Sequence, residues 1–320
     1  MSKIKRGVLF IVILAVFLLA SSVGMECYVV HQLNGEVTGR NRPFAALTVE
    51  PEDTLDLLVA GDSESYNSVS TMRLWDDKGI TTYDCGQGAQ RIPETYYMLK
   101  HAFKKQSPKI VILETNTLFR DIGAVKSTQE ILTQAGQYYL PVFRYHNLWK
   151  TVVDEPEMHT NYKGFVIRDE VDPYEGKPET MPEYVNVYLE KIEELCEKNN
   201  AQLLLVSMPS PKNWNHKRHA EIQKYADGKG ITYLDLNKKV EELGLNWTED
   251  TQDKGDHLNV YGAEKVTSYL GNYLEENYEL EDHRNDPTYE AWNQLAEQYK
   301  QNLARIKGKI EVAKETGVGK

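Results

Sequence analysis

Five short apolar segments, separated by helical patterns, constrain the fold of this chain most strongly. They are residues 55–60 (LDLLVA), 80–85 (ITTYDC), 110–114 (IVILE), 203–208 (LLLVSM) and 231–236 (ITYLDL). Three of them are almost entirely aliphatic, which is typical of strands buried on both faces of a parallel sheet. Helical patterns lie between and after them, at residues 93–105, 181–199, 217–227 and 261–276. This alternation predicts an α/β fold with a three-layer, doubly wound, flavodoxin-like sheet of five parallel strands.

The boundaries of this α/β domain follow from the same pattern, and we expect it to span residues 54–280. An insertion at 117–180 lies between the third and fourth strands, and connections of that length are usually lids or binding elements. Residues 281–320 predict a long amphipathic helix that begins at Asp286, with Pro287 in its first turn. Its apolar stripe favours packing against its own domain, and a partner helix or self-association is the alternative.

The N-terminus predicts a membrane anchor. Three cations in residues 1–6 precede nineteen uncharged residues at 7–25, enough helix to span about 30 Å of hydrocarbon. The cations predict that the N-terminus lies on the cytoplasmic side of the membrane and the domain on the outer side. A linker at 26–53 is expected to join the anchor to the domain. A cleaved signal peptide and a lipid-modified Cys27 are the alternatives.

Charge and residue usage exclude several classes of function. Lys and Arg number 37 against 48 Asp and Glu, and a net charge of −11 disfavours nucleic acid as a partner. The three cysteines are too few for a disulfide scaffold, and neither they nor the eight histidines show metal-ligand spacing. We therefore expect no metal and no cofactor.

Two distant segments carry a serine and a histidine to the carboxyl edge of the predicted sheet. Ser63 lies in the turn Gly-Asp-Ser-Glu-Ser that directly follows the first strand, and His257 precedes the last helix of the domain. A serine hydroxyl needs a base to take its proton, and a histidine needs a carboxylate to hold its tautomer. Asp253 and Asp256 are both candidates for that carboxylate. An ordinary turn and a helix cap are the competing interpretations of these segments.

Two more loops at that edge could stabilise an oxyanion. The segment 85–90 (CGQGAQ) is rich in small residues, so its backbone N–H groups could approach a bound oxyanion closely. Asn116 follows the third strand and could add a side-chain donor.

These four segments together resemble the blocks of the SGNH/GDSL hydrolase superfamily. The resemblance covers roughly residues 54–277 and implies Ser63 as nucleophile and His257 as base. It also implies an oxyanion hole formed by the backbone N–H groups of Ser63 and of Gly88 or Ala89, and by the side chain of Asn116. The Asp-x-x-His spacing of the superfamily is absent here. We favour Asp253 over Asp256 as the partner of His257, because adjacent residues rarely fold back on one another, and a Ser-His dyad stays open.

The layout and the segment 257–265 (HLNVYGAEK) resemble a narrower group of membrane-anchored bacterial proteins. These accompany membrane-bound O-acyltransferases, as do the alginate O-acetylation proteins and the D-alanine transfer protein of teichoic acid synthesis. The resemblance implies acyl transfer to, or removal from, a surface glycan. Arg144, His146 and Trp149 in the insertion could bind sugars, or could form a small satellite core. A non-catalytic scaffold that recruits the membrane enzyme is the alternative function.

Overall fold

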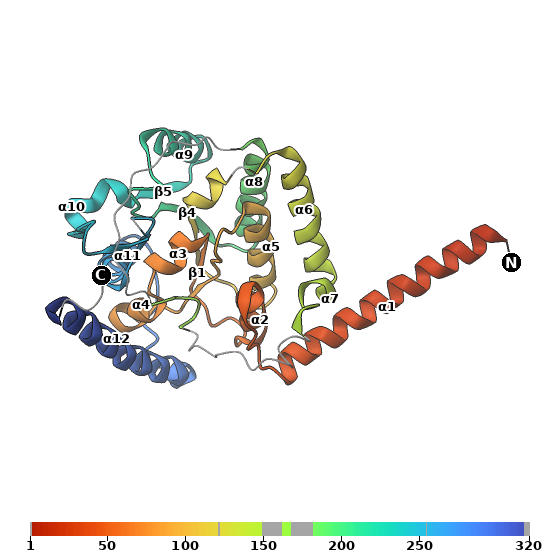
Figure 1. Cartoon of the computed structure of the whole chain (residues 1–320), viewed down its shortest axis with the longest axis horizontal. Coiled ribbons are helices and arrows are strands. Elements are labelled where there is room, and N and C mark those ends of the chain that lie inside the picture. The colour runs from red at the N-terminus through yellow and green to blue at the C-terminus, as the bar shows by residue number, and fades with distance from the viewer. Residues whose placement is uncertain (1, 121, 149–161, 168–181, 254, 317–320) are drawn as a thin grey trace.

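The structure is a computed structural model of the 320-residue chain. It describes residues 2–120, 122–148, 162–167, 182–253 and 255–316, with side chains to residue 310 (Figure 1).

The centre of the domain is a five-stranded parallel sheet, as the apolar segments predict. Its strands are β1 (Leu57–Ala60), β2 (Thr82–Asp84), β3 (Ile110–Glu114), β4 (Gln202–Ser207) and β5 (Thr232–Asp235). They lie in the order β2-β1-β3-β4-β5, which is the flavodoxin-like order. Each strand begins within two residues of its predicted start, because a strand buried on both faces is visible in sequence as a continuous apolar run.

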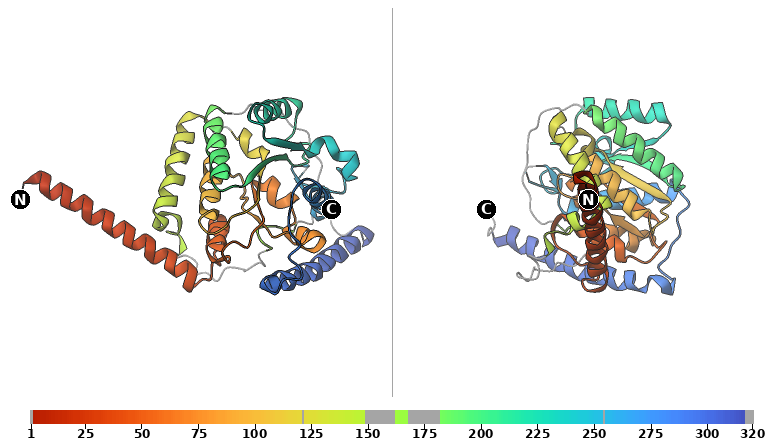
Figure 2. Two further views of the ribbon diagram at one scale, coloured as in Figure 1. Left: turned by 180° about the vertical axis from the view of Figure 1, so that it is seen from behind. Right: turned by 90° about the vertical axis from the view of Figure 1, so that its right-hand side faces the viewer.

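Helices cover both faces of the sheet, so the predicted three-layer architecture is confirmed (Figures 1 and 2). Alternate strand residues such as Leu58, Val111 and Leu205 share one core with α5 (Ile92–Ala102), α8 (Glu183–Lys198) and α9 (His216–Lys229). Their neighbours in the strands share the second core with α11 (Val260–Asn277) and with Leu74 of α4 (Thr71–Lys78).

The C-terminal helix packs on its own domain, at least over its first half. Asp286 caps a short turn at Pro287–Tyr289, and α12 (Glu290–Thr316) follows directly. Trp292 lies against Trp75 of α4, with ring centroids 5.3 Å apart. Tyr299 is buried and its hydroxyl accepts a hydrogen bond from Ser70 Oγ at 2.9 Å. The apolar stripe of this helix is therefore used in the fold of the domain.

The N-terminal region differs from the expected anchor and linker. Helix α1 (Lys3–His31) continues past residue 25, and α2 (Arg42–Val49) packs Phe44 and Leu47 into the first core. Residues 26–53, the expected linker, are therefore largely helical and partly buried. The helix α1 is long and apolar enough to cross a membrane, a property that signal sequences share.

The described part of the insertion adds two helices beside this region. Helix α6 (Ala124–Tyr139) packs on α5, and α7 (Pro141–Arg144) packs on the end of α1. A small third core joins these elements, formed by Val29, Val37, Ala45, Tyr145 and Leu148. Much of the rest of the expected lid, at 149–161 and 168–181, lies outside the described residues.

Candidate active site

Ser63 stands at the carboxyl edge of the sheet, as the first residue of α3 (Ser63–Ser68). The chain leaves β1 through Gly61, where a Cβ atom would lie 2.5 Å from Cβ of Glu114 on β3. Only glycine fits that close approach. Asp62 then caps the helix, because its Oδ1 accepts the backbone N–H of Glu64 at 2.9 Å. Local geometry thus holds the half-buried Ser63 hydroxyl at the start of the helix.

His257 reaches Ser63 from a two-stranded antiparallel hairpin. The strands β6 (Thr251–Gln252) and β7 (His257–Leu258) pair Gln252 with His257. The imidazole Nε2 lies 2.7 Å from Ser63 Oγ, and Nδ1 lies 3.1 Å from Asp253 Oδ2. With the proton on Nδ1, the ring donates to Asp253 and accepts from the serine. This tautomer is the one that a general base for Ser63 requires.

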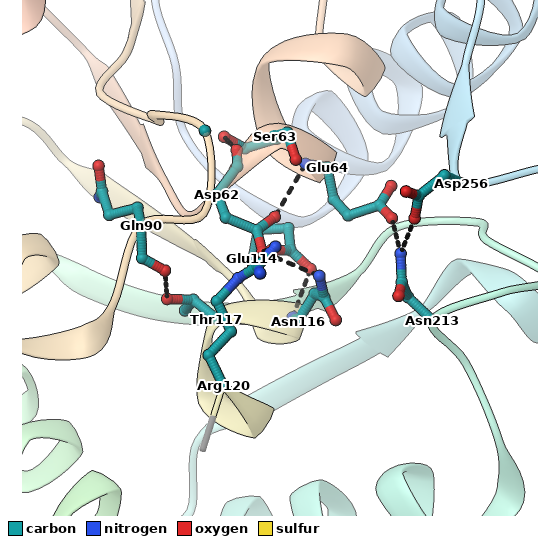
Figure 3. Close-up of polar contacts among 12 residues, drawn as sticks. Asp62, Ser63, Glu64, Gln90, Glu114, Asn116, Thr117, Arg120, Asn213 and Asp256 are labelled. Atoms are coloured by element: carbon teal, nitrogen blue, oxygen red, sulfur yellow. Dashed lines mark hydrogen bonds and ion pairs between the residues drawn. The ribbon is translucent and has the colours of Figure 1, made fainter. Parts of the chain in front are cut away.

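Asp256, the alternative partner of His257, instead bonds a lysine and an asparagine. Its Oδ2 accepts from Lys212 Nζ at 2.8 Å and its Oδ1 accepts from Asn213 Nδ2 at 2.7 Å. The same Asn213 amide donates to Glu64 Oε1 at 2.6 Å. Figure 3 shows the Asn213 amide pointing at both carboxylates. Asn213 thereby ties the residue after the nucleophile to the residue before the base.

Asn116 is the predicted oxyanion donor that the structure brings beside the serine segment. Its Nδ2 donates to Asp62 Oδ2 at 2.8 Å, and its Oδ1 accepts from Arg218 Nη1 at 2.9 Å (Figure 3 shows the first pair). A cation on the oxygen and a carboxylate at the nitrogen fix which way this amide points. Arg120 also donates to Asp62 Oδ2, from its Nε at 2.6 Å. One N–H of Asn116 is used by Asp62, which leaves its second N–H for a ligand.

Gly88 and Ala89 are the oxyanion donors predicted in the glycine segment. Gly88 and Ala89 form an exposed turn, in which the Gly88 carbonyl accepts from Arg40 Nη1 at 2.7 Å. The closest glycine of this loop to the serine segment is Gly86, where a Cβ atom would lie 2.1 Å from Ser65 Oγ. However, the Gly86 N–H already donates to Asp84 Oδ1 at 2.7 Å. The glycine segment therefore packs against the nucleophile helix without presenting a described contact to Ser63.

Besides Asp62, three buried acids lie around this site. Burial raises the pKa of Glu64 well above its usual range, and the negative charges of Asp62 and Glu114 raise it further. Burial likewise raises the pKa of Glu114 well above normal, and it raises the pKa of Asp84 to about 7. Burying a charge without a full set of partners is costly, so burial favours the protonated form of Glu64 and of Glu114.

Glu64, Asp256 and His257 are the described residues that could hold a metal ion, because one ligand atom of each lies within 4.8 Å of the others. Both ring nitrogens of His257 are already engaged, with Ser63 and with Asp253. A metal at this position would displace one of those bonds and so disable the base.

The tentative sugar-binding residues lie elsewhere. Arg144 is buried, with its guanidinium 3.3 Å from the centroid of the Phe44 ring, and His146 bonds the Phe143 carbonyl at 2.7 Å. The satellite-core interpretation is correct for this segment, since Tyr145 and Leu148 are buried beside α1. Arg144 is therefore wrong as a sugar ligand, because its charged group is covered. Trp149 lies outside the described residues.

Sequence reasoning missed Glu64, Asn213 and Arg218. The signal for Asn213 was present, since residues 208–215 follow β4 at the same edge of the sheet. Arg218 comes from α9, and nothing in the sequence marks it as the partner of an asparagine about a hundred residues earlier.

No protein-family model matches the chain, and no curated protein matches its sequence. Solved structures with a similar fold include a GDSL-like lipase from Bacteroides thetaiotaomicron, at 12% identity and a TM-score of 0.37, covering 69% of this chain and 87% of the lipase. A psychrotrophic esterase from Pseudoalteromonas sp. is 10% identical, with a TM-score of 0.40 and coverage of 69% and 96%. A lipase/acylhydrolase from Enterococcus faecalis is 12% identical, with a TM-score of 0.39 and coverage of 71% and 99%.

Proposed function

We propose that this chain is a serine esterase or acyltransferase in which Ser63 is the nucleophile. The observation that carries the proposal is the relay from Ser63 Oγ to His257 Nε2 at 2.7 Å and from His257 Nδ1 to Asp253 at 3.1 Å. Both distances are within hydrogen-bond reach, which is the geometric requirement for an activated serine.

The reaction begins when His257 Nε2 takes the hydroxyl proton of Ser63. The serine oxygen attacks the carbonyl carbon of an acyl ester, and the carbonyl oxygen becomes an oxyanion. The second N–H of Asn116 and the backbone N–H of Ser63 stabilise this oxyanion. The intermediate then collapses, the alcohol leaves with the proton from His257, and the acyl group stays on Ser63. A second hydroxyl, from water or from an acceptor, releases the acyl group by the reverse sequence.

A groove lined in part by Tyr66, on the helix that begins at Ser63, supports binding of a substrate of some size. It encloses about 320 Å³ and is lined by Tyr66, Gly86 and Gly88, together with Arg40 and Arg42 of the N-terminal region. Tyr66 lies one turn of α3 after Ser63. Small residues and aromatic rings in such a groove suit the extended face of a sugar chain.

The setting of the reaction is the membrane surface. Helix α1 would anchor the chain, and the cations before residue 7 favour an extracytoplasmic domain. The resemblance of residues 257–265 to proteins that accompany O-acyltransferases supports O-acyl groups, notably O-acetyl groups, of a surface glycan as the substrate. It also supports a membrane-bound O-acyltransferase as a partner.

A fluorophosphonate probe tests the nucleophile directly. The full chain is expected to be labelled at Ser63 and to hydrolyse p-nitrophenyl acetate, and Ser63→Ala is expected to lose both properties. Ser268→Ala on α11 is the matched control and should keep them. Absence of labelling in the parent chain would reject catalysis, and a scaffolding role would then account for the fold.

Addition of an oligosaccharide acceptor separates transfer from hydrolysis. A transferase gives an O-acylated oligosaccharide in amounts that depend on Ser63, whereas an esterase releases only free acid at every acceptor concentration.

A further inference from the structure

Helices α6 and α7 carry a strip of apolar side chains exposed to solvent. Val125, Leu132, Tyr139 and Phe143 have exposed fractions of 84%, 67%, 61% and 45%. The first three are spaced by seven residues, which puts them on one face of α6. We call these four residues the α6–α7 strip. Exposed apolar groups arranged in line, rather than scattered singly, mark a surface that meets an apolar partner.

The strip lies on the side of the domain from which α1 projects (Figures 1 and 2). Helix α7 touches α1 directly, since the backbone N–H of Val142 donates to Ser22 Oγ at 3.3 Å and Ser22 is buried. Phe143 is the next residue of α7. The apolar strip is therefore continuous with the point where α1 leaves the domain.

The length of α1 decides how close this point lies to a bilayer. From Gly7, the first residue after the cations, to Ser22 the helix rises about 22 Å. The hydrocarbon of a bilayer is about 30 Å thick. If α1 enters hydrocarbon at Gly7, the contact between Ser22 and α7 falls at the outer boundary of the bilayer or inside it. Helix α7 then lies in contact with the lipid.

The lysine and tyrosine side chains around the strip are also of the kind that lies among lipid headgroups. Lys100 Nζ donates to Tyr139 Oη at 3.1 Å, and Lys104 Nζ lies 4.8 Å from the centroid of the Tyr138 ring. Tyrosines with lysines are typical of the membrane interface. Between residues 122 and 148 the sequence has a single acid, Glu130, which pairs with Arg91 at 3.5 Å. The chain has a net charge of −11, yet its described residues from 122 to 148 contain no acid other than this paired one.

We infer that the α6–α7 strip lies on the outer surface of the lipid bilayer that α1 enters, with Leu132, Tyr139 and Phe143 among the headgroups and Lys100 and Lys104 facing anionic phosphates. The inference rests on the membrane anchor of the proposed function. It adds a second contact to the single helix, and two contacts fix the orientation of the domain over the membrane.

Spin labels at single cysteines of the full chain test this placement. The background is Cys27→Ser, because Cys85 and Cys196 are buried. Leu132→Cys probes the strip, Val12→Cys probes α1, and Gln298→Cys on α12 is the exposed control on the far side of the domain. The chain is reconstituted into vesicles of phosphatidylcholine and phosphatidylglycerol in equal amounts. Collision with oxygen reports lipid, collision with a water-soluble nickel chelate reports water, and unchanged esterase activity checks folding.

We expect the labels at 12 and 132 to collide mainly with oxygen and the label at 298 mainly with the nickel chelate. If the label at position 132 collides mainly with the nickel chelate, as the label at 298 does, while the label at 12 collides mainly with oxygen, the inference is overturned and the anchor is left intact. If that label becomes protected only in native membranes, a protein partner covers the strip, and the inference is also overturned. A label at 12 that is open to nickel rejects the anchor itself, and with it the inference.

Discussion

The carboxylate of Asp253 lies 3.1 Å from Nδ1 of His257, across the turn that joins two short antiparallel strands. Gln252 pairs with His257, so the residue after Gln252 starts the turn and stands beside the imidazole. Asp253 adopts a left-handed conformation, with φ of +52°, and Gly255 has φ of +78°. Asp253 and His257 can therefore form a hydrogen bond although they lie four residues apart, because the turn of the hairpin brings their side chains together.

Asp253→Asn is expected to lower kcat/KM for an acyl ester by roughly 10²-fold. The amide keeps the shape of the carboxylate but loses the charge that stabilises the imidazolium and its tautomer. Steady-state hydrolysis of p-nitrophenyl acetate measures the effect.

Asp256→Asn is the matched control, with an expected change of only a few-fold. Its amide oxygen can still accept from Asn213, and the carboxylate of Asp256 does not bond the ring in the described structure. If Asp256→Asn proved as damaging as Asp253→Asn, the orienting role would belong to both carboxylates and the assignment to Asp253 would be wrong.

The sheet could be predicted from sequence because its strands are buried on both faces. Leu57, Val59 and Ile112 face one core, whereas Leu58, Val111 and Leu113 face the other, so each run is apolar throughout. The hairpin of β6 and β7 could not be predicted, since strands of two residues have no periodicity. Helix α2 was missed for a related reason, because its eight residues are too few to give a clear helical periodicity.

A site residue could be predicted from sequence only where it directly follows a strand or belongs to one of the four motif segments that resemble the SGNH/GDSL superfamily. Ser63, His257 and Asn116 meet that condition, and the structure brings them to one edge. Arg144 shows the limit, because an arginine among aromatic residues in a loop fits a sugar site and a buried cation equally well. The Phe44 ring that covers it lies a hundred residues earlier, and only the tertiary structure supplies that contact.

Trp292→Ala should destabilise the domain by about 3–5 kcal/mol, because it removes a buried indole from the contact with Trp75. Urea unfolding followed by circular dichroism measures the change. Gln298→Ala on the exposed face of α12 should stay within about 0.5 kcal/mol of the parent. A Trp292→Ala chain of parental stability that changed only its oligomeric state would instead make α12 an association helix.

The contribution of Asp84 to the stability of the fold should fall as the pH rises from about 4 to about 7. Burial raises the pKa of Asp84 to about 7, whereas an exposed aspartate titrates near 4. Between those values the folded chain binds a proton that the unfolded chain has lost, so folding weakens with increasing pH, by up to about 4 kcal/mol for this group.

Asp84→Asn mimics the protonated acid at every pH and should flatten this dependence. Its side-chain oxygen can still accept from Ser65 Oγ and from the Gly86 N–H. Melting temperatures at pH 5 and pH 8 should therefore differ less in Asp84→Asn than in the parent, and the variant should be the more stable of the two at pH 8. Equal slopes in the two chains would show that Asp84 is ionised throughout.

Asn213 should position the base and the nucleophile without touching the substrate. Its amide spans Glu64, next to Ser63, and Asp256, next to His257, two segments that lie nearly two hundred residues apart in sequence. Asn213→Asp removes the amide that donates to Glu64 and to Asp256 and puts a third acid between them, so it should lower kcat roughly tenfold or more, with little change in KM. Adding Glu64→Gln should recover part of that loss, because the amide it introduces can donate to the new carboxylate at position 213.

Steady-state kinetics of the single and double variants, with their melting temperatures as a folding check, test the prediction. A loss that appeared only in KM, or one that Glu64→Gln deepened, would mean that this asparagine contacts the substrate instead.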